Sequence, residues 1–175
     1  MAHLHQHEFF ERIKAKHPEF FDNVSVLDIG SLDINGTVRD LFTGGSYLGV
    51  DVAEGAGVDV VGFGQSLDFE DRSFDVCLSA ECFEHNPDWV ATFANMVRMC
   101  RGLVLVSCAT SGRDEHGTSR CHPGSSPLSV ELWDYYRNLT EADFVDEFDL
   151  DEMFGEWSFE VNEDSCDLYF VGFVK

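Results

Sequence analysis

Acidic and imidazole side chains gather directly after an apolar run at residues 74–79. Glu81, Glu84 and His85 follow that run within six positions. Imidazole and carboxylate groups serve as general bases when they lie within hydrogen-bond reach of a substrate. His85 is therefore the first candidate for a catalytic base, with Glu81 beside it. The alternative is that His85 merely starts a helix or faces solvent.

A second group of reactive side chains lies in residues 109–139. This stretch concentrates Arg, His and Tyr in a chain otherwise dominated by acids. A long irregular segment in a compact domain is usually functional or disordered. We expect it to form the substrate side of a pocket or a lid, with His116 also a catalytic candidate. The predicted substrate contacts are Arg113, His116, Tyr135, Tyr136 and Arg137. The alternative is a structural cover for the sheet edge, with Tyr136 in the core.

The spacing of Gly30 and Asp51 predicts a nucleoside-binding site. Gly30 ends an apolar run, and Asp51 ends the next one 21 residues later. In open α/β sheets this geometry brings the backbone close to a cofactor and gives its ribose hydroxyls a carboxylate partner. The alternative is a turn glycine and a strand-end cap. Leu32 and Asn35 replace glycines of the dinucleotide fingerprint, which disfavours a nicotinamide-dependent reductase.

The elements that must position these residues alternate between strand and helix. This order predicts an α/β fold. The expected strands are residues 24–30, 47–51, 58–61, 74–79 and 103–107, and the expected helices are residues 6–20, 35–43 and 88–101, with a further capped helix starting at Thr140. Residues 157–161 and 168–174 are expected to close the sheet as an antiparallel hairpin.

Four segments, taken in order, resemble the motifs of class I S-adenosylmethionine-dependent methyltransferases of the small "methyltransferase domain" type. They are residues 26–31 (VLDIGS), 47–51 (YLGVD), 73–85 (SFDVCLSAECFEH) and 102–107 (GLVLVS). The resemblance covers residues 24–107. It implies a Rossmann-like methyltransferase sandwich, a mostly parallel sheet with a C-terminal antiparallel hairpin strand.

The resemblance also implies S-adenosylmethionine as cofactor and S-adenosylhomocysteine as product. Asp28, Gly30 and Ser31 would lie at the methionine end and Asp51 at the ribose. The loop at residues 62–66 would approach adenine, with Phe63 in place of an acidic residue and contributing stacking or main-chain contacts. The full set of implied cofactor contacts is Asp28, Gly30, Ser31, Leu32, Asp51, Val52, Phe63, Gly64, Ser79 and Ala80. Leu32 and Ile34 replace two glycines of the family's first loop, so this loop is expected to take another path.

Methyl transfer is an in-line displacement, in which the protein mainly positions two reactants and excludes water. The leading interpretation is an enzyme that methylates a small-molecule acceptor. The alternative is a noncatalytic S-adenosylmethionine-binding or interaction protein on the same fold, since a fold does not by itself establish catalysis.

The formal net charge of −22 limits the partners. Residues 141–175 alone hold twelve acidic side chains against Lys175. Such a field repels nucleic acid, whose binding depends on Lys and Arg, and anionic lipid. We therefore expect no nucleic-acid partner, and an acidic surface that either is simply solvated or recruits cations.

The remaining features suggest a single cytoplasmic domain over residues 1–175, with an N-terminal helix and tail at residues 1–22. No apolar run is long enough to span a membrane, and no secretion signal is apparent. The six cysteines form no CxxC pair, and His3, His5 and His7 lack a completing Cys or carboxylate cluster. The sequence therefore predicts no functional metal site.

Overall fold

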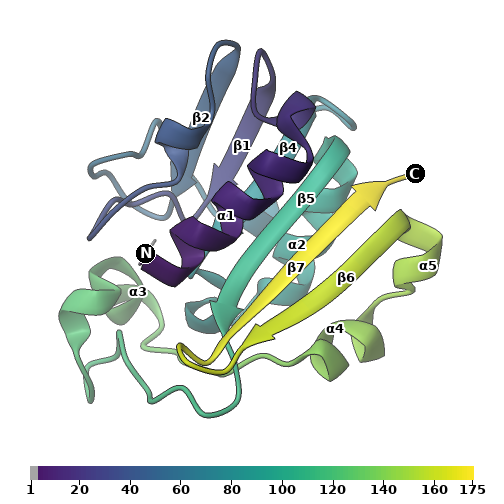
Figure 1. Ribbon diagram of the computed structural model, residues 1–175. Coiled ribbons are helices and arrows are strands. Elements are labelled where there is room, and N and C mark those ends of the chain that lie inside the picture. The colour runs from purple at the N-terminus through teal and green to yellow at the C-terminus, as the bar shows by residue number, and fades with distance from the viewer. Residues whose placement is uncertain (1–3) are drawn as a thin grey trace.

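The computed structural model describes residues 4–175, which build one seven-stranded sheet in the order β3-β2-β1-β4-β5-β7-β6 (Figure 1). The strands are β1 (Ser25–Ile29), β2 (Ser46–Asp51), β3 (Val60–Val61), β4 (Phe74–Ala80), β5 (Cys100–Ala109), β6 (Phe154–Asn162) and β7 (Asp167–Val174). The first five strands are parallel, and β7 runs antiparallel between β5 and β6. The predicted α/β class and the closing hairpin are confirmed.

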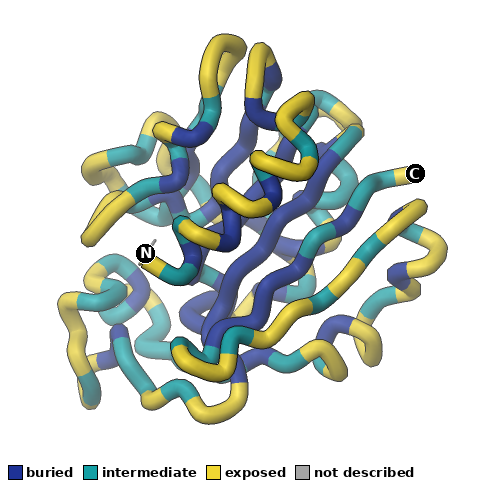
Figure 2. Tube along the Cα trace, viewed as in Figure 1, coloured by how far each residue is buried: buried dark blue, intermediate teal, exposed yellow. Residues whose placement is uncertain are grey.

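Helices cover both faces of the sheet and bury its central strands (Figures 1 and 2). On one face α1 (Leu4–Lys16) buries Phe9, Phe10 and Ile13 against the strands. On the other, α2 (Trp89–Met99) packs with α4 (Glu141–Glu147) and α5 (Leu150–Met153). The remaining helix, α3 (Pro127–Leu132), follows the irregular segment after β5. Over residues 4–175, no helix has the length and apolar character that crossing a membrane requires.

The main local patterns behave as predicted. Helix α4 begins with a capping box, in which Thr140 and Asp143 satisfy each other's backbone N–H groups. Helix α1 ends just before His17 and Pro18, because the residue preceding a proline is disfavoured in helical geometry.

The helix predicted at residues 35–43 is wrong. This stretch contains only a single 3-10 turn, η2 (Arg39–Leu41). Side-chain oxygens accept hydrogen bonds from backbone N–H groups of this stretch: Asp33 accepts from the Gly36 N–H at 2.8 Å, and Thr37 accepts from the Arg39 N–H at 3.1 Å. Such local bonds compete with helix formation. The chain after β1 is therefore an open loop over the strand ends.

Candidate functional site

Gly30 brings the loop after β1 against the end of β4. Its φ is +85°, and a Cβ there would lie 2.4 Å from Cys82 Cβ. No other residue type fits this position, because a side chain would be strained and would clash. Ser79 reinforces the junction by donating its hydroxyl to the Ile29 carbonyl at 2.7 Å.

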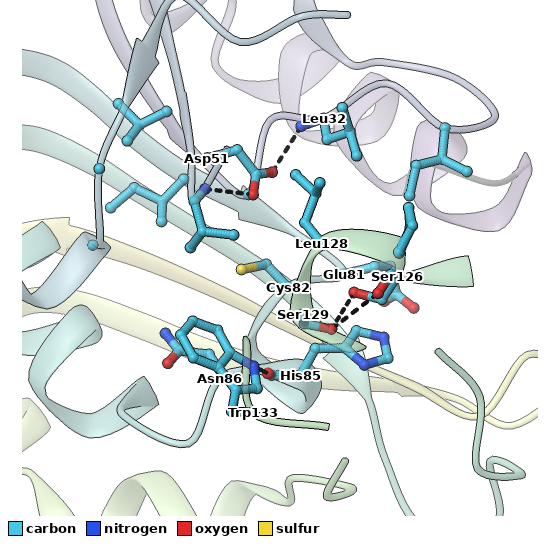
Figure 3. Close-up of a pocket in the computed structure, with 18 of the residues that line it drawn as sticks. Leu32, Asp51, Glu81, Cys82, His85, Asn86, Ser126, Leu128, Ser129 and Trp133 are labelled. Carbon is cyan, nitrogen blue, oxygen red and sulfur yellow. Dashed lines mark hydrogen bonds between the residues drawn. The ribbon is translucent and has the colours of Figure 1, made fainter. Parts of the chain in front are cut away.

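Asp51 lies at the end of β2 with both carboxylate oxygens anchored to the backbone (Figure 3). Oδ2 accepts from the Leu32 N–H at 3.0 Å, and Oδ1 accepts from the Val52 N–H at 2.7 Å. Burial raises the pKa of this carboxyl, and the two backbone bonds act in the opposite direction. Each oxygen keeps a further lone pair, so Asp51 can still accept hydrogen bonds from a diol.

Asp51 lines the main pocket, which holds about 660 Å³ of space, part of it open to solvent. One wall comes from the ends of β1 and β2. The opposite wall comes from the segment containing α3, where Leu128 and Trp133 face the strand ends (Figure 3). Trp133 Nε1 donates to the His85 carbonyl at 2.5 Å, and the Trp133 ring lies 5.9 Å from that of Phe63. These contacts hold the α3 segment over the pocket.

The implied cofactor residues divide between this pocket and its surroundings. Gly30, Leu32, Asp51, Val52 and Gly64 line the main pocket. A small adjoining cavity of about 230 Å³, which shares Gly30 and Leu32 with the main pocket, is lined by Asp28, Ser31 and Ala80. Ser79 is fully buried in the sheet, and Phe63 lies at the rim beside Trp133.

Asp28 is a buried acid with one strong partner. The Tyr47 hydroxyl donates to its Oδ2 at 2.8 Å, while Oδ1 has no hydrogen-bond partner among residues 4–175. Burial outweighs the Tyr47 bond and raises the pKa of Asp28 to about 6.

The predicted catalytic residues lie directly after β4. Glu81 has a φ of +55°, a conformation that costs a non-glycine residue strain, and Glu84 and His85 lie in the turn η4 (Phe83–His85). All three side chains are buried. Burial, reinforced by the charges of Glu84 and Asp167, raises the pKa of Glu81 well above its usual value. Burial also lowers the pKa of His85 to about 4.

His116 joins this group from the segment after β5. Its ring lies 5.0 Å from that of His85 in an edge-to-face arrangement, and the Tyr136 ring packs against both. A second cavity of about 610 Å³ lies here, lined by Glu81, His85, Arg113, Asp114, Glu115, His116, His122 and Ser125. It shares Glu81, His85 and Ser125 with the main pocket.

The predicted substrate residues are only partly brought together. Arg113 and His116 line the second cavity, and Arg113 also donates to the Ser165 carbonyl and pairs with Asp167 at 3.4 Å. Tyr135 lines neither cavity, although its backbone forms a hydrogen bond with the His85 side chain. Arg137 is exposed, pairs with Asp143 of α4 and lines neither cavity.

Several lining residues were not anticipated. Gln65, Cys82, Asn86, Leu128 and Ser129 all line the main pocket. Cys82 and Asn86 flank predicted residues, so proximity in the sequence is a signal for them. Gln65 lies in the loop expected to approach adenine, and Leu128 and Ser129 lie in the segment expected to form a pocket wall or lid. No pattern in the sequence indicated that a helix, α3, would form there and line the main pocket rather than the second cavity.

The histidines that lie near carboxylates in the structure are not only the N-terminal ones considered in the sequence. His5 and His7 lie on α1 beside Glu8 and Glu11, whereas His3 lies outside the described residues. In the part of the chain that the structure describes, one atom each of Glu84, His85 and His116 lie within 4.8 Å of one another. None of these three residues is one of the N-terminal histidines on which the sequence argument rested.

Comparisons with known proteins agree with this architecture. Residues 27–105 match a family model described as "Methyltransferase domain". A search of curated proteins gave no significant match.

Several solved structures share the fold. The YcgJ protein of Bacillus subtilis has a TM-score of 0.64 and 12% identity, covering 99% of each chain. A Burkholderia thailandensis 1,6-didemethyltoxoflavin-N1-methyltransferase, solved with that substrate and S-adenosylhomocysteine, has a TM-score of 0.61 and 14% identity, covering 100% of this chain and 92% of its own. The CurJ carbon methyltransferase has a TM-score of 0.66 and 15% identity, covering 96% and 54%. At such identities the likeness shows the shared fold.

Proposed function

We propose, on the premise that residues 27–105 match a methyltransferase-domain family model, that the protein is a class I methyltransferase that transfers a methyl group from S-adenosylmethionine to a small-molecule acceptor. We further propose that residues 1–175 work as one catalytic unit, and that nucleic acid is not the substrate. The net charge of −22 supports the last point, because duplexes are bound mainly through cationic side chains.

The main pocket suits the nucleoside part of S-adenosylmethionine. Ile29, Val50 and Leu128 provide apolar walls for a flat base, and Trp133 lies near Phe63 at one side. Asp51 is fixed by two backbone bonds at the position where ribose hydroxyls would be recognised. The apolar walls and the accepting carboxylate of Asp51 therefore fit the base and the ribose of the cofactor.

The second cavity suits the acceptor. It lies beneath the segment after β5, and its walls are mostly polar or charged side chains. The cavity holds about 610 Å³ of space, part of it open to solvent, which is within the roughly 300–1,000 Å³ typical of small-molecule sites. This comparison supports the small-molecule assignment over a macromolecular acceptor.

One observation carries the proposal: the two cavities share Glu81, His85 and Ser125. When bound, the cofactor supplies an electrophilic methyl group attached to a sulfonium. A molecule held in the second cavity would then approach the first from the side where Glu81 and His85 stand. The protein would contribute alignment of the two molecules and exclusion of water.

Glu81, His85 and His116 are proposed to manage the acceptor's proton. If the acceptor is a hydroxyl or a protonated amine, its proton must pass to a base as the new bond to carbon forms. Burial lowers the pKa of His85 to about 4, so the ring is neutral at pH 7 and can accept a proton, but it is a weak base. The raised pKa of Glu81 makes its carboxylate a stronger proton acceptor than an exposed one.

The test has two stages. Calorimetry with S-adenosylmethionine and S-adenosylhomocysteine measures binding, and formation of S-adenosylhomocysteine with a panel of small hydroxyl and amine compounds measures turnover. Binding with turnover of at least one compound supports the proposal. Binding without turnover of any compound in a broad panel favours the noncatalytic alternative, and no binding of either molecule contradicts both.

A further inference from the structure

We propose that Glu84, His85 and His116 form a binding site for a divalent transition-metal ion, of which Zn²⁺ is the ion this ligand set favours. The site would lie in the wall of the second cavity. Ion binding does not depend on the function proposed above. The role suggested for the ion, holding an acceptor atom, does rest on that function.

The three side chains supply a recognised ligand combination. Two imidazole nitrogens and one carboxylate oxygen with an open fourth position are typical of catalytic zinc sites. The ligand atoms lie within 4.8 Å of one another, against roughly 3.3 Å expected around a bound zinc ion. His116 is only half-buried and lies on an irregular segment, so a small movement of its ring can close the set.

Hydrogen bonds to backbone carbonyls prepare both histidines for an ion. His116 Nδ1 lies 3.1 Å from the Asp114 carbonyl oxygen, and since that oxygen can only accept, Nδ1 carries the proton and Nε2 carries the lone pair. His85 bonds the backbone of Tyr135, while its Nδ1 has no partner among residues 4–175. Metal-ligating histidines characteristically direct their second nitrogen to a carbonyl or carboxylate in this way.

The environment of the Glu84 carboxylate is the strongest evidence for a bound cation. Its side chain is fully buried, and within residues 4–175 neither carboxylate oxygen has an amide, hydroxyl or cationic donor. The neighbouring Glu81 carboxyl can serve as a partner only when one of the two acids holds a proton. Buried charges are normally paired or bound to metal, and an ion between Glu84 and the histidines would supply the partner.

The side chains around the site favour a cation. Gly117 packs on His85: a Cβ there would lie 2.6 Å from Cε1 and 3.2 Å from Nδ1, so any larger residue would clash with this edge of the ring. The cavity wall also carries Glu81 and Asp114, whereas its one arginine, Arg113, is paired with Asp167, and its third acid, Glu115, is paired with Arg120.

The site's position suggests what the ion would do. Three protein ligands leave a coordination position free, and the cavity proposed for the acceptor lies on that wall. An acceptor hydroxyl or carboxylate taken up there would be held beside the main pocket. With the ion bound, the lone pairs of both histidines are occupied, so the proton of a bound hydroxyl would pass to Glu81 instead. The ion would favour that deprotonated form, which is the better nucleophile.

Metal binding to the full chain tests this proposal directly. After chelator treatment, Zn²⁺ is titrated by calorimetry into the wild type and into His116→Ala and Glu84→Gln variants, and Co²⁺ absorption reports the coordination number. We expect one ion per chain and at least a tenfold loss of affinity in each variant. We also expect the four-coordinate Co²⁺ spectrum to be lost in His116→Ala.

Two controls isolate the site. The His122→Asn variant changes a histidine that lines the same cavity but lies outside the set. The triple variant His3→Gln, His5→Gln and His7→Gln removes the N-terminal histidines. Both should bind Zn²⁺ as the wild type does.

Several outcomes would overturn the proposal: no Zn²⁺ binding, wild-type affinity in His116→Ala, or loss of binding in the triple variant. Because Glu84 is buried, circular dichroism must show that the Glu84→Gln variant folds. If it does not fold, the Zn²⁺ affinity of His116→Ala alone decides whether the site exists. S-adenosylmethionine binding, measured on the same samples without metal, separates failure of this site from failure of the proposed function.

Discussion

At the scale of single residues, two acids at the strand ends, the buried Asp28 and the half-buried Asp51, have different contacts. Asp51 accepts hydrogen bonds from two backbone N–H groups and lines the main pocket, whereas Asp28 accepts one from Tyr47 and lines the small adjoining cavity. A resemblance of motifs placed both at the cofactor. The contacts support a direct binding role for Asp51 and a mainly structural one for Asp28.

Replacing Asp51 should weaken cofactor binding. We expect Asp51→Ala to lower the affinity for S-adenosylmethionine and S-adenosylhomocysteine about 10- to 150-fold, because charge-assisted hydrogen bonds contribute about 1.5–3 kcal/mol. Calorimetry measures the change, and Glu54→Ala, an exposed acid in the loop after β2, is the control. Unchanged affinity in Asp51→Ala would place the ribose elsewhere.

Asp28 should make the fold less stable as the pH rises. Between the unfolded pKa near 3.8 and the folded pKa of about 6, only the folded state holds this proton. Its contribution to the free energy of unfolding is therefore greatest below pH 4, and about 3 kcal/mol is lost as the pH rises past 6. Asp28→Asn should show a weaker decline between pH 4 and pH 6.5 in denaturant unfolding. An identical pH dependence in both proteins would contradict this assignment.

At the scale of elements, residues 109–139 provide the wall and cover of the second cavity. His116 lines that cavity, while Arg137 lies outside it against α4. We expect His116→Ala to lower turnover of an accepted substrate at least tenfold while leaving S-adenosylmethionine affinity near wild type. Arg137→Ala should leave both quantities near wild type. Equal loss of cofactor binding and turnover in His116→Ala would assign the segment to structural support.

The α3 segment should act as a lid on the main pocket. Trp133 holds this segment in place by donating a hydrogen bond to the His85 carbonyl and by packing beside Phe63. Trp133→Ala removes one hydrogen bond and an aromatic contact, each worth roughly 1 kcal/mol, so we expect S-adenosylmethionine to bind about 30-fold more weakly and to dissociate faster. Stopped-flow fluorescence or calorimetry measures this. The neighbouring exposed Leu132 serves as the matched control in Leu132→Ala, and equal effects of the two substitutions would argue against a lid.

At the scale of the whole molecule, the charge of −22 governs long-range interactions. We expect no retention of duplex DNA or RNA in a gel-shift assay at physiological ionic strength. We also expect the melting temperature to rise between 10 mM and 300 mM NaCl, because salt screens repulsion between the acids. Tight, salt-sensitive retention of nucleic acid would refute this account of the surface.

The sequence by itself determined the sheet and the first half of the site. Apolar runs such as residues 74–79 mark buried parallel strands because both of their faces must leave water. The proximity of Gly30 and Asp51 could be predicted in the same way, because parallel strands end at one edge of the sheet and bring their terminal residues together. The capping signal at Thr140 is equally local.

Only the tertiary structure decided the rest. The loop at residues 31–38 escapes helix formation through particular hydrogen bonds, which propensity does not capture. The approach of His116 to Glu84 and His85 depends on how the chain after β5 folds back, as does the position of α3 over the main pocket. Contacts between irregular segments are set by packing and by single hydrogen bonds, and these leave no periodic pattern in the sequence.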